Sequence, residues 1–397
     1  MVRQCSPFAA LSCGVALLLV GIQNASLCHG YGDPSDSFPA ESNLVERFVV
    51  SRNDRIHESF PDLAMAANGD LVVTYQESES HGGGAASSIV ARTSGDEGRT
   101  WSERIVVAHS ADRVRTGWLN CSRILRLHDD SLLIAVDRIP QSNIPAQAHH
   151  FWADNRAVML LFRSQDHGRT WTGPEETPVR GGIVPSLRQL RDGTLLAGIT
   201  RFDEDDNWRQ YQLLFRSRDK GLTWQGPTTV AKDSRTQPNE GDFVELPGGE
   251  VVCYLRDDEP GSTSGLRCVS HDGGRTWGPI AHCGRWRFSG RPAAGLLAEG
   301  RILVTTRVGA PQAGNWFGAF VESPENALGR ADEGSHSVLI ENDTNPERPD
   351  HGYSGWVELP DGSVYVVQYI TADAPAHKPF IRGYRIQRSF FGKTSDM

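Results

Sequence analysis

Arginine supplies almost all of the positive charge of this 397-residue chain. Of its 40 Lys and Arg residues, only Lys220, Lys232, Lys378 and Lys393 are lysines. A guanidinium group is planar and donates two parallel hydrogen bonds, so arginine is suited to binding carboxylate or sulfate groups. Two explanations stay open at this point: the arginines form a site for an anionic ligand, or a GC-rich coding sequence has favoured arginine codons.

Four octapeptides share the pattern Ser-x-Asp-x-Gly-x-Thr-Trp. They are SGDEGRTW (94–101), SQDHGRTW (164–171), SRDKGLTW (217–224) and SHDGGRTW (270–277). Calcium binding would need about 6–8 oxygen ligands, and each loop offers one carboxylate. We expect instead that each Asp accepts hydrogen bonds from a turn, that the Gly adopts a positive φ, and that the Trp packs between neighbouring sheets. The octapeptides therefore predict a repeated structural element and not the catalytic centre.

A second repeat lies between the octapeptides. Six segments each contain an apolar stretch, a turn rich in Gly or Asp, and a second apolar stretch; they are residues 61–75, 122–136, 185–199, 242–255, 293–306 and 355–368. Each segment predicts two strands joined by a tight turn. A period of about 50–60 residues, repeated six times, is typical of blades arranged radially. The sequence thus predicts an all-β fold, a six-bladed β-propeller of four-stranded antiparallel blades.

This topology predicts where a site would lie. In a four-stranded meander the hairpin turn and the octapeptide are on the same rim, so the opposite rim collects the starts of the innermost strands and the ends of the second strands. Polar residues gather at those positions: His57, Glu58, Ser59, Asn120, Arg123, Asp137, Arg138, Ser186, Arg201, Asn239, Glu240, Asp242, Arg256, Asp257, Arg291, Arg307, His351, Tyr353 and Tyr369. We expect a polar funnel rich in arginine, although any single arginine could equally pair with a neighbouring acid.

The four octapeptides resemble the Asp boxes, or BNR repeats, of the sialidase (neuraminidase) superfamily, and the resemblance spans about residues 44–390. It implies a sialidase-like propeller. It also implies an exo-glycoside hydrolase that removes a terminal acidic sugar, sialic acid or a relative, from a glycan or glycoconjugate. Such an enzyme retains the anomeric configuration and needs neither a metal nor a cofactor.

Two further matches imply the residues that would attack the sugar. HGYSGWVELPDG (351–362) resembles the sialidase segment whose Tyr is the nucleophile, which implies Tyr353. PNEGDFVELPGGEVVCYLR (238–256) resembles the blade that carries the Glu partner of this Tyr and a carboxylate-binding Arg, which implies Glu240 and Arg256. Sialic acid bears a carboxylate on its anomeric carbon, so a neutral phenol with a pKa of about 10 approaches more easily than a carboxylate would. The alternative for Tyr353 is a packing role at the mouth of the channel.

The remaining substrate contacts depart from the family pattern. SGRPAAGLL (289–297) supplies Arg291 as a second carboxylate-binding candidate. Sialidases open blade one with Arg-Ile-Pro, whose Arg completes a clamp of three arginines, and here Ser59 stands in that place. Arg123 or Arg138 from the next blade could compensate, but the sequence does not show that either does.

The proton-transfer residue is also altered. In the family it is an Asp in the loop before the first Asp box, and the corresponding loop ESESHGGGAASS (77–88) contains no Asp. Glu77, Glu79 or His81 could transfer a proton, and we assign Glu79. The alternative is a solvated glycine-rich loop without a catalytic role.

Composition and cysteine content exclude several other classes. The net charge of −9 speaks against a nucleic-acid interface, which would need an excess of basic residues. Beyond the N-terminus no segment reaches the roughly 20 apolar residues of a membrane span. Cys121, Cys253, Cys268 and Cys283 do not form metal-type pairs. Cys253 and Cys268 flank one hairpin and are either a disulfide or two buried thiols.

The N-terminus resembles an export signal. Arg3 precedes an apolar run at residues 8–22, and small residues follow. We therefore expect a signal peptide at residues 1–28, a flexible linker at 29–43 and the propeller at 44–390, in a secreted or periplasmic protein. The sequence carries no signal for an oligomeric state.

A second function is compatible with the altered residues: a non-catalytic carbohydrate-binding propeller with a degenerate sialidase site. Trp118, Trp152, Trp208 and Trp316 could stack on sugar faces, or could equally belong to the core. A purely structural scaffold fits least, because it leaves Tyr353 and Glu240 unexplained.

Overall fold

The computed structural model of the protein describes residues 43–392, except for residues 82, 111–116, 141–154, 285–286, 310–313, 332–334, 346, 373 and 375–377. The expected signal peptide at 1–28 and residues 29–42 of the expected linker lie outside the described residues.

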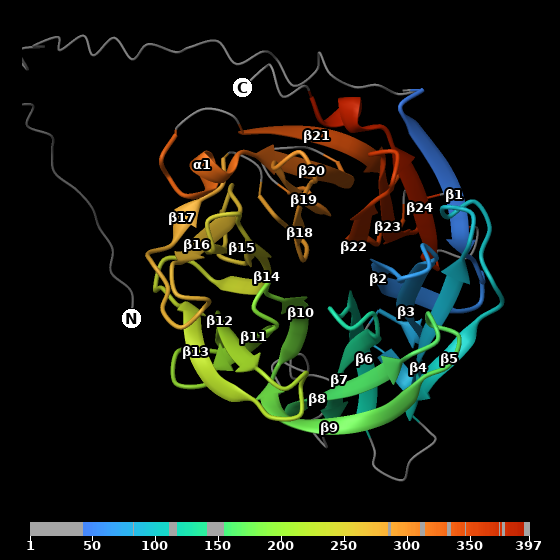
Figure 1. Cartoon of the computed structure of the whole chain (residues 1–397), viewed down its shortest axis with the longest axis horizontal. Helices are drawn as coiled ribbons and strands as arrows, with labels where there is room; N and C mark the ends of the chain where they lie inside the picture. The colour runs from blue at the N-terminus through green and yellow to red at the C-terminus, as the bar shows by residue number, and fades with distance from the viewer. Residues whose placement is uncertain are drawn as a thin grey trace, which may run out of the picture. The chain divides into compact units, whose positions relative to one another are not determined.

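Six antiparallel sheets of four strands each surround a central axis (Figure 1). This arrangement confirms the prediction of an all-β, six-bladed propeller. Helical structure in the described part is limited to short pieces such as α1 (Pro324–Ala327) and a 3₁₀ turn at Arg388–Phe391. From the axis outward, the strands are β2 (His57–Met65), β3 (Leu71–Ser80), β4 (Gly83–Ser94) and β5 (Ile105–His109) in blade one, and β6 (Gly117–Arg126), β7 (Leu132–Pro140), β8 (Ala157–Ser164) and β9 (Thr172–Gly181) in blade two. In the same order they are β10 (Ile183–Gln189), β11 (Leu195–Asp203), β12 (Arg209–Ser217) and β13 (Gln225–Ala231) in blade three, and β14 (Pro238–Glu245), β15 (Val251–Asp257), β16 (Leu266–Ser270) and β17 (Ala281–His282) in blade four. They are β18 (Ala293–Leu296), β19 (Ile302–Arg307), β20 (Trp316–Glu322) and β21 (Ser335–Asn342) in blade five, and β22 (His351–Glu358), β23 (Val364–Ile370), β24 (Phe380–Ile386) and β1 (Val45–Ser51) in blade six.

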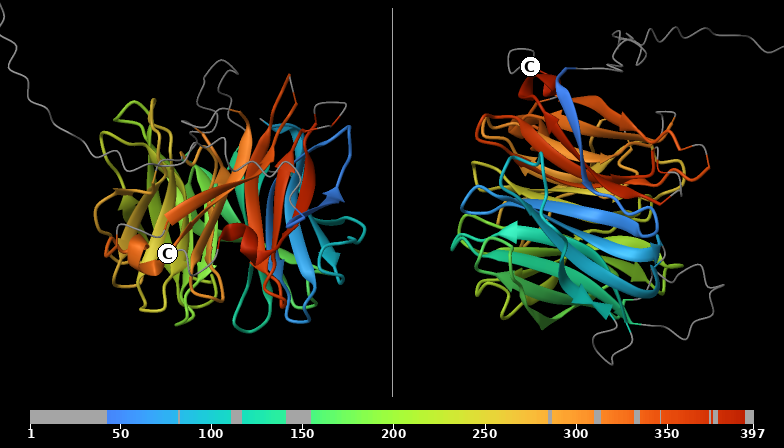
Figure 2. Two further views of the ribbon diagram at one scale, coloured as in Figure 1. Left: turned by 90° about the horizontal axis from the view of Figure 1, so that it is seen from above. Right: turned by 90° about the vertical axis from the view of Figure 1, so that its right-hand side faces the viewer.

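The last blade is completed by the first strand of the chain. β1 pairs antiparallel with β24, in a register that runs from Val45 opposite Ile386 to Ser51 opposite Ile381. Hydrogen bonds between the two ends of the propeller therefore close the ring. The side views show the sheets standing next to one another around the axis, with β1 at the edge of blade six (Figure 2).

The blades are held together by apolar clusters that lie between them. The cluster between blades six and one, for example, joins Val73 and Tyr75 of β3 to Val367 and Tyr369 of β23. Corresponding clusters lie between each of the other neighbouring pairs of blades. The second strands are buried on both faces, as their continuous apolar sequence indicates.

The octapeptides have the structural role that their sequence predicts. In the first one, Asp96 accepts hydrogen bonds from Ser94 Oγ at 2.8 Å, from the Thr100 amide at 2.9 Å and from Thr100 Oγ1 at 2.6 Å. Gly98 has a φ of +83°, and a Cβ on it would lie 2.1 Å from the ring of Tyr365, so only glycine fits. The ring of Trp101 packs beside Tyr365 of blade six. The other three octapeptides repeat these Asp contacts.

The innermost strands are irregular near their starts. In five of the six blades the register between the first and second strands shifts at this point, which marks a β-bulge. Three bulge residues have a positive φ: Phe60 at 56°, Glu240 at 49° and Gly352 at 104°. Such a conformation is uncommon for a residue with a side chain, and bulges often redirect side chains at functional sites.

The four described cysteines are buried free thiols. Cys253 and Cys268 lie opposite each other on β15 and β16, so their proximity is as expected, but they are not bonded. Of the two alternatives for this pair, the structure shows the reduced one. No helix in the described ranges is long and apolar enough to span a bilayer.

Candidate active site

Tyr353 and Glu240 meet near the start of the innermost strands, at the rim opposite the octapeptides. Tyr353 follows Gly352 at the bulge of β22, and Glu240 is itself the positive-φ residue at the bulge of β14. The hydroxyl of Tyr353 donates a short hydrogen bond to Oε1 of Glu240. Both side chains are buried, with exposed fractions of 8% and 3%.

Arg256 connects the two groups. It lies at the end of β15, and its Nη1 donates to Oε2 of Glu240 at 2.9 Å and to the hydroxyl of Tyr353 at 3.2 Å. Burial alone would lower the pKa of Arg256, but the charge of Glu240 and other nearby anions outweigh this effect and raise it. Burial, and then the charge of Glu240, raises the pKa of Tyr353 well above its ordinary value. The phenol is therefore neutral at rest, beside a carboxylate placed to accept its proton.

These groups face a cavity of about 480 Å³. It is lined by Phe60, His81, Asn120, Cys121, Ile183, Phe202, Asn207, Trp208, Gln210, Gln237, Glu240, Arg256, Asp258, Arg307 and Tyr353. Most of these residues come from the starts of first strands or the ends of second strands. Polar amides, two guanidinium groups and several apolar surfaces thus converge on one space, a composition suited to a single sugar unit.

Arg307 also lines this cavity, although the sequence analysis did not assign it to substrate binding. Its Nε donates to the carbonyl of Ser289 at 3.1 Å, and no described carboxylate lies within ion-pair distance of its guanidinium. The sequence could have predicted this position of Arg307, because Arg307 is the sixth residue of β19 and Arg256 is the sixth residue of β15. The same position in two consecutive blades therefore directs arginine into the cavity.

Arg291 lies beneath Tyr353 and does not line the cavity. Its guanidinium carbon is 5.0 Å from the centroid of the Tyr353 ring, and its Nη2 donates to the carbonyl of Pro61 at 3.3 Å. The side chain is fully buried. In this position Arg291 supports the nucleophile candidate from below by a cation–π contact.

Ser59 stands where the family pattern has its third arginine, and aromatic side chains surround the next residue. Ser59 is buried, and its hydroxyl donates to Oε1 of Gln76 at 3.3 Å. The ring of the next residue, Phe60, has its centroid 5.3 Å from that of Tyr353, 5.4 Å from that of Tyr369 and 5.2 Å from that of His81. This corner of the cavity is therefore aromatic.

Neither of the two arginines considered as replacements reaches the cavity. Arg123 is fully buried, with Nε 3.4 Å from Asp62 and Nη2 3.8 Å from Asp242, and burial together with the charge of Arg291 lowers its pKa to about 10. Arg138 forms an ion pair with Glu176 at 3.0 Å, between β7 and β9. The arginines that line the cavity are thus Arg256 and Arg307.

The loop between β3 and β4 brings His81 to the cavity. Glu77 is bound by Arg104 at 2.5 Å, and the Glu79 side chain is exposed while its carbonyl accepts a hydrogen bond from Lys378. Neither glutamate lines the cavity. His81 does, and its Nδ1 lies 2.9 Å from Oδ2 of Asp350.

The tryptophans considered for sugar stacking have different positions. Trp208 lines the cavity, Trp118 is buried against Ile139 and Ala157, and Trp316 begins β20 away from the cavity. Trp152 lies outside the described residues. Of the three described tryptophans in this group, only Trp208 is therefore placed to contact a ligand in the cavity.

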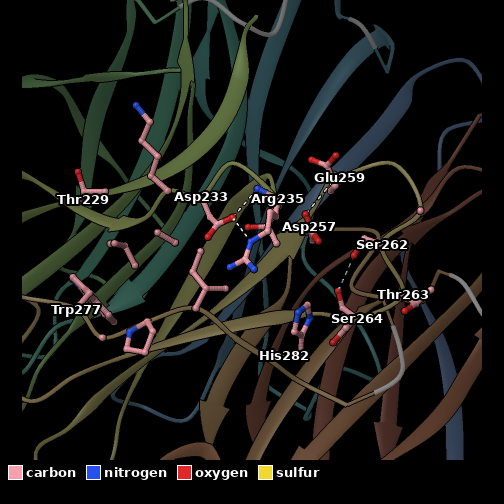
Figure 3. Close-up of a pocket in the computed structure, with 18 of the residues that line it drawn as sticks. Thr229, Asp233, Arg235, Asp257, Glu259, Ser262, Thr263, Ser264, Trp277 and His282 are labelled. Carbon is pink, nitrogen blue, oxygen red and sulfur yellow. Dashed lines mark hydrogen bonds and ion pairs between the residues drawn. The ribbon is translucent and has the colours of Figure 1, made fainter. Parts of the chain in front are cut away.

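A larger groove of about 920 Å³ lies between blades three and four (Figure 3). Two of its carboxylates already have partners: Asp233 accepts from the Arg235 amide at 2.6 Å, and Glu259 binds Arg209 at 2.7 Å. Both spaces are within the usual size range of ligand sites, about 300–1,000 Å³, so volume does not decide between them. The smaller cavity is the better candidate, because it holds the Tyr353, Glu240 and Arg256 cluster.

Residues 144–306 match the BNR repeat-like domain family. A protein of unknown function from Dyadobacter fermentans has the same fold, with a TM-score of 0.70 at 22% identity over 87% of this chain and 100% of that chain. The intramolecular trans-sialidase from Ruminococcus gnavus has a TM-score of 0.60 at 12% identity, over 85% of this chain and 96% of that chain. The α-L-arabinanase from Penicillium chrysogenum has a TM-score of 0.59 at 16% identity, over 86% and 97%. No curated protein matches the chain. The family match supports the predicted BNR-repeat relationship over residues 144–306, and at such identities the structural likeness establishes the propeller fold alone.

Proposed function

We propose that the protein is a retaining exo-glycoside hydrolase that removes a terminal acidic sugar, sialic acid or a relative, with Tyr353 as the nucleophile. One observation carries the proposal: the phenol of Tyr353 donates to the carboxylate of Glu240, and Arg256 contacts both at the wall of the cavity. A packing role for Tyr353 would not require a buried carboxylate and a guanidinium at its hydroxyl.

In the first step, the Tyr353 oxygen attacks the anomeric carbon while Glu240 accepts the phenolic proton. The bond to the leaving group breaks and a glycosyl–tyrosine intermediate forms. Arg256 stabilises the developing negative charge on the phenol oxygen, since its Nη1 already lies 3.2 Å from it. Water then attacks the same carbon, and Glu240 returns the proton to Tyr353.

Arg307 and Arg256 would bind the acidic group of the sugar. Arg256 is already shared between Glu240 and Asp258, whose Oδ1 is 2.8 Å from its Nε. Arg307 has no such carboxylate partner in the described part of the chain, so it is the main anchor for an anionic substituent. The apolar side chains of Ile183, Phe202 and Trp208 would contact the sugar ring.

The protein would meet this substrate outside the cytoplasm. The proposal of a secreted or periplasmic location is supported by the N-terminal sequence, in which Arg3 precedes an apolar run.

The decisive experiment is incubation of the purified protein with 4-methylumbelliferyl glycosides of sialic acid and of hexuronic acids. We expect release of the fluorophore from at least one of them, loss of this activity in Tyr353→Phe, and retention of anomeric configuration by NMR. A fluorinated substrate with a fast leaving group should also label the peptide that contains Tyr353, as mass spectrometry would show. Turnover by Tyr353→Phe equal to that of the wild type would rule out this nucleophile.

The alternative function, acidic-sugar binding without hydrolysis, is favoured by one observation. Ser59 stands where the family pattern has its third arginine and the neighbouring Phe60 lines the cavity, so the cavity has fewer charged contacts than the family pattern provides. Tight binding of a free acidic monosaccharide by calorimetry, together with no turnover of any glycoside, would support this alternative.

A further inference from the structure

We infer that His81, oriented by Asp350 and His57, is the group that protonates the leaving group and later activates water. This inference rests on the proposed function. It assigns the proton-transfer role to an imidazole held by a carboxylate, on residues from three different parts of the chain.

The three side chains form one hydrogen-bonded cluster at the cavity. Oδ2 of Asp350 is 2.9 Å from Nδ1 of His81 and 3.0 Å from Nε2 of His57. Asp350 immediately precedes β22, the strand that carries Tyr353, while His57 begins β2 and His81 lies between β3 and β4. The cluster is therefore attached to the same strand as the proposed nucleophile.

His81 and Tyr353 both pack against the aromatic ring of Phe60. The Phe60 centroid is 5.2 Å from His81 and 5.3 Å from Tyr353, and all three residues line the cavity. A sugar placed over Phe60 would lie against both the phenol and the imidazole. Glu77 and Glu79 have no comparable position, because neither lines the cavity.

The protonation states of the cluster follow from its contacts. Nδ1 of His57 is buried without a hydrogen-bond partner among the described residues, so the proton of that ring belongs on Nε2, which donates to Asp350. Burial lowers the pKa of His57, which keeps it neutral. Burial would raise the pKa of Asp350, but the hydrogen bonds from both imidazoles outweigh this and lower it, which keeps the carboxylate charged.

His81 is the member of the cluster whose ring faces the cavity. It is half exposed at the cavity, with 46% of its side chain accessible, and its Nδ1–H is directed at the Asp350 carboxylate. Other groups near the cluster include Tyr369, 6.5 Å from both imidazole rings, Lys378, which lies close enough to His57 to lower its pKa further, and His351, on which the charge of Asp350 acts. A carboxylate on Nδ1 stabilises the imidazolium, as in other His–Asp pairs of hydrolases.

The proton balance of the two steps is complete with these residues. In the first step, the Nε2 proton of the His81 imidazolium moves to the glycosidic oxygen as the bond from the anomeric carbon to that oxygen breaks. In the second step, neutral His81 accepts a proton from the attacking water at Nε2, while the bond from the sugar to Tyr353 breaks. After the two steps, His81 and Tyr353 have returned to their starting protonation states.

Metal binding is the rival interpretation, since the three ligand atoms lie within 4.8 Å of one another. It would require the Nε2 lone pair of His57 and would move the ring proton to the buried Nδ1, which has no described acceptor. Metal-bound histidines normally donate their second ring N–H to a partner. The hydrogen-bonded cluster is therefore the better interpretation.

The test compares two leaving groups, because an acid catalyst matters most when the leaving group is a poor one. For His81→Asn we expect kcat/KM to fall about 100-fold or more on an unactivated alkyl or sugar glycoside, and less than about 10-fold on a 4-nitrophenyl glycoside. His128→Asn, an exposed histidine on the opposite rim, is the matched control and should change neither value. Asp350→Asn should move the alkaline limb of the pH profile, and thermal unfolding of each variant reports whether it is folded.

The outcomes separate the inference from the proposed function. Equal losses on both substrates in folded His81→Asn, or the leaving-group dependence appearing in Glu79→Gln instead, would overturn the role of His81 while leaving Tyr353 in place. Loss of wild-type activity in EDTA that Zn²⁺ restores would overturn it in favour of a metal site. No wild-type turnover of either substrate would overturn both proposals.

Discussion

The hydroxyl of Tyr353 donates a hydrogen bond to the carboxylate of Glu240, although the two residues are 113 positions apart in the chain. The contact joins blade six to blade four across the mouth of the axis. If Glu240 accepts the phenolic proton during attack, Glu240→Gln should lower kcat about 10²- to 10⁴-fold. The double variant with Tyr353→Phe should be no slower than Tyr353→Phe alone, because the two residues act as a unit. Additive losses in steady-state kinetics would show that they act independently.

Arg307 should govern affinity for the acidic group. Arg307→Gln removes a charge-assisted contact of about 1.5–3 kcal/mol, so we expect KM to rise about 10- to 100-fold with a smaller change in kcat. Arg138→Gln should leave KM unchanged, because Arg138 is bound to Glu176 outside the cavity. Arg126→Gln, on an exposed hairpin on the opposite rim, is the matched control. An increase in KM for Arg138→Gln and none for Arg307→Gln would reverse the assignment.

Glu58 should make the stability of the fold depend on pH. Burial raises the pKa of Glu58 from 4.5 to about 7, and Oε2 of this carboxyl has no described hydrogen-bond partner. At pH values between these two, the folded state binds a proton that the unfolded state has lost. The free energy of unfolding should therefore decrease as pH rises from about 4.5 to 7, by up to about 3 kcal/mol. Above pH 7 the contribution of Glu58 should no longer change with pH. Urea denaturation of Glu58→Gln should show a smaller slope over the same window. An unchanged slope in Glu58→Gln would show that another group causes the pH dependence of stability.

The octapeptides should affect stability without affecting catalysis. Asp166→Ala removes the acceptor of hydrogen bonds from Ser164, from the Thr170 amide and from the Thr170 hydroxyl, so we expect a loss of about 1–2 kcal/mol of unfolding free energy. The value of kcat should remain that of the wild type. Glu103→Ala, an exposed carboxylate near the first octapeptide, serves as the control for charge alone. A loss of activity in folded Asp166→Ala would assign this loop a functional role.

The blade architecture could be predicted because it is repeated in the sequence. Each octapeptide and each hairpin segment is local, and its hydrogen bonds involve residues at most a few positions apart. The membership of β1 in blade six could not be read in this way, because β1 lies outside the repeats and its partner β24 is more than 300 residues away.

Tyr353, Glu240 and Arg256 could be predicted because their segments resemble those of sialidases, and Arg307 could have been predicted from the pattern that two blades share. Arg256 and Arg307 occupy equivalent positions in consecutive second strands, so a comparison of the blades would have selected Arg307 over Arg291. The role of Phe60 could not be foreseen, because its positive φ at a bulge opposes the preference of a bulky residue. The link from Asp350 to His81 spans 269 positions and has no local signature.

The pairing of β1 with β24 has a consequence for how the protein acquires its catalytic apparatus. Among the strands, β1 is synthesised first and β24 last, so β1 cannot pair with β24 until almost the whole polypeptide has been synthesised. Blade six, which carries Tyr353, is therefore the last to be assembled, and a chain truncated before residue 380 contains every octapeptide but no closed ring around its nucleophile.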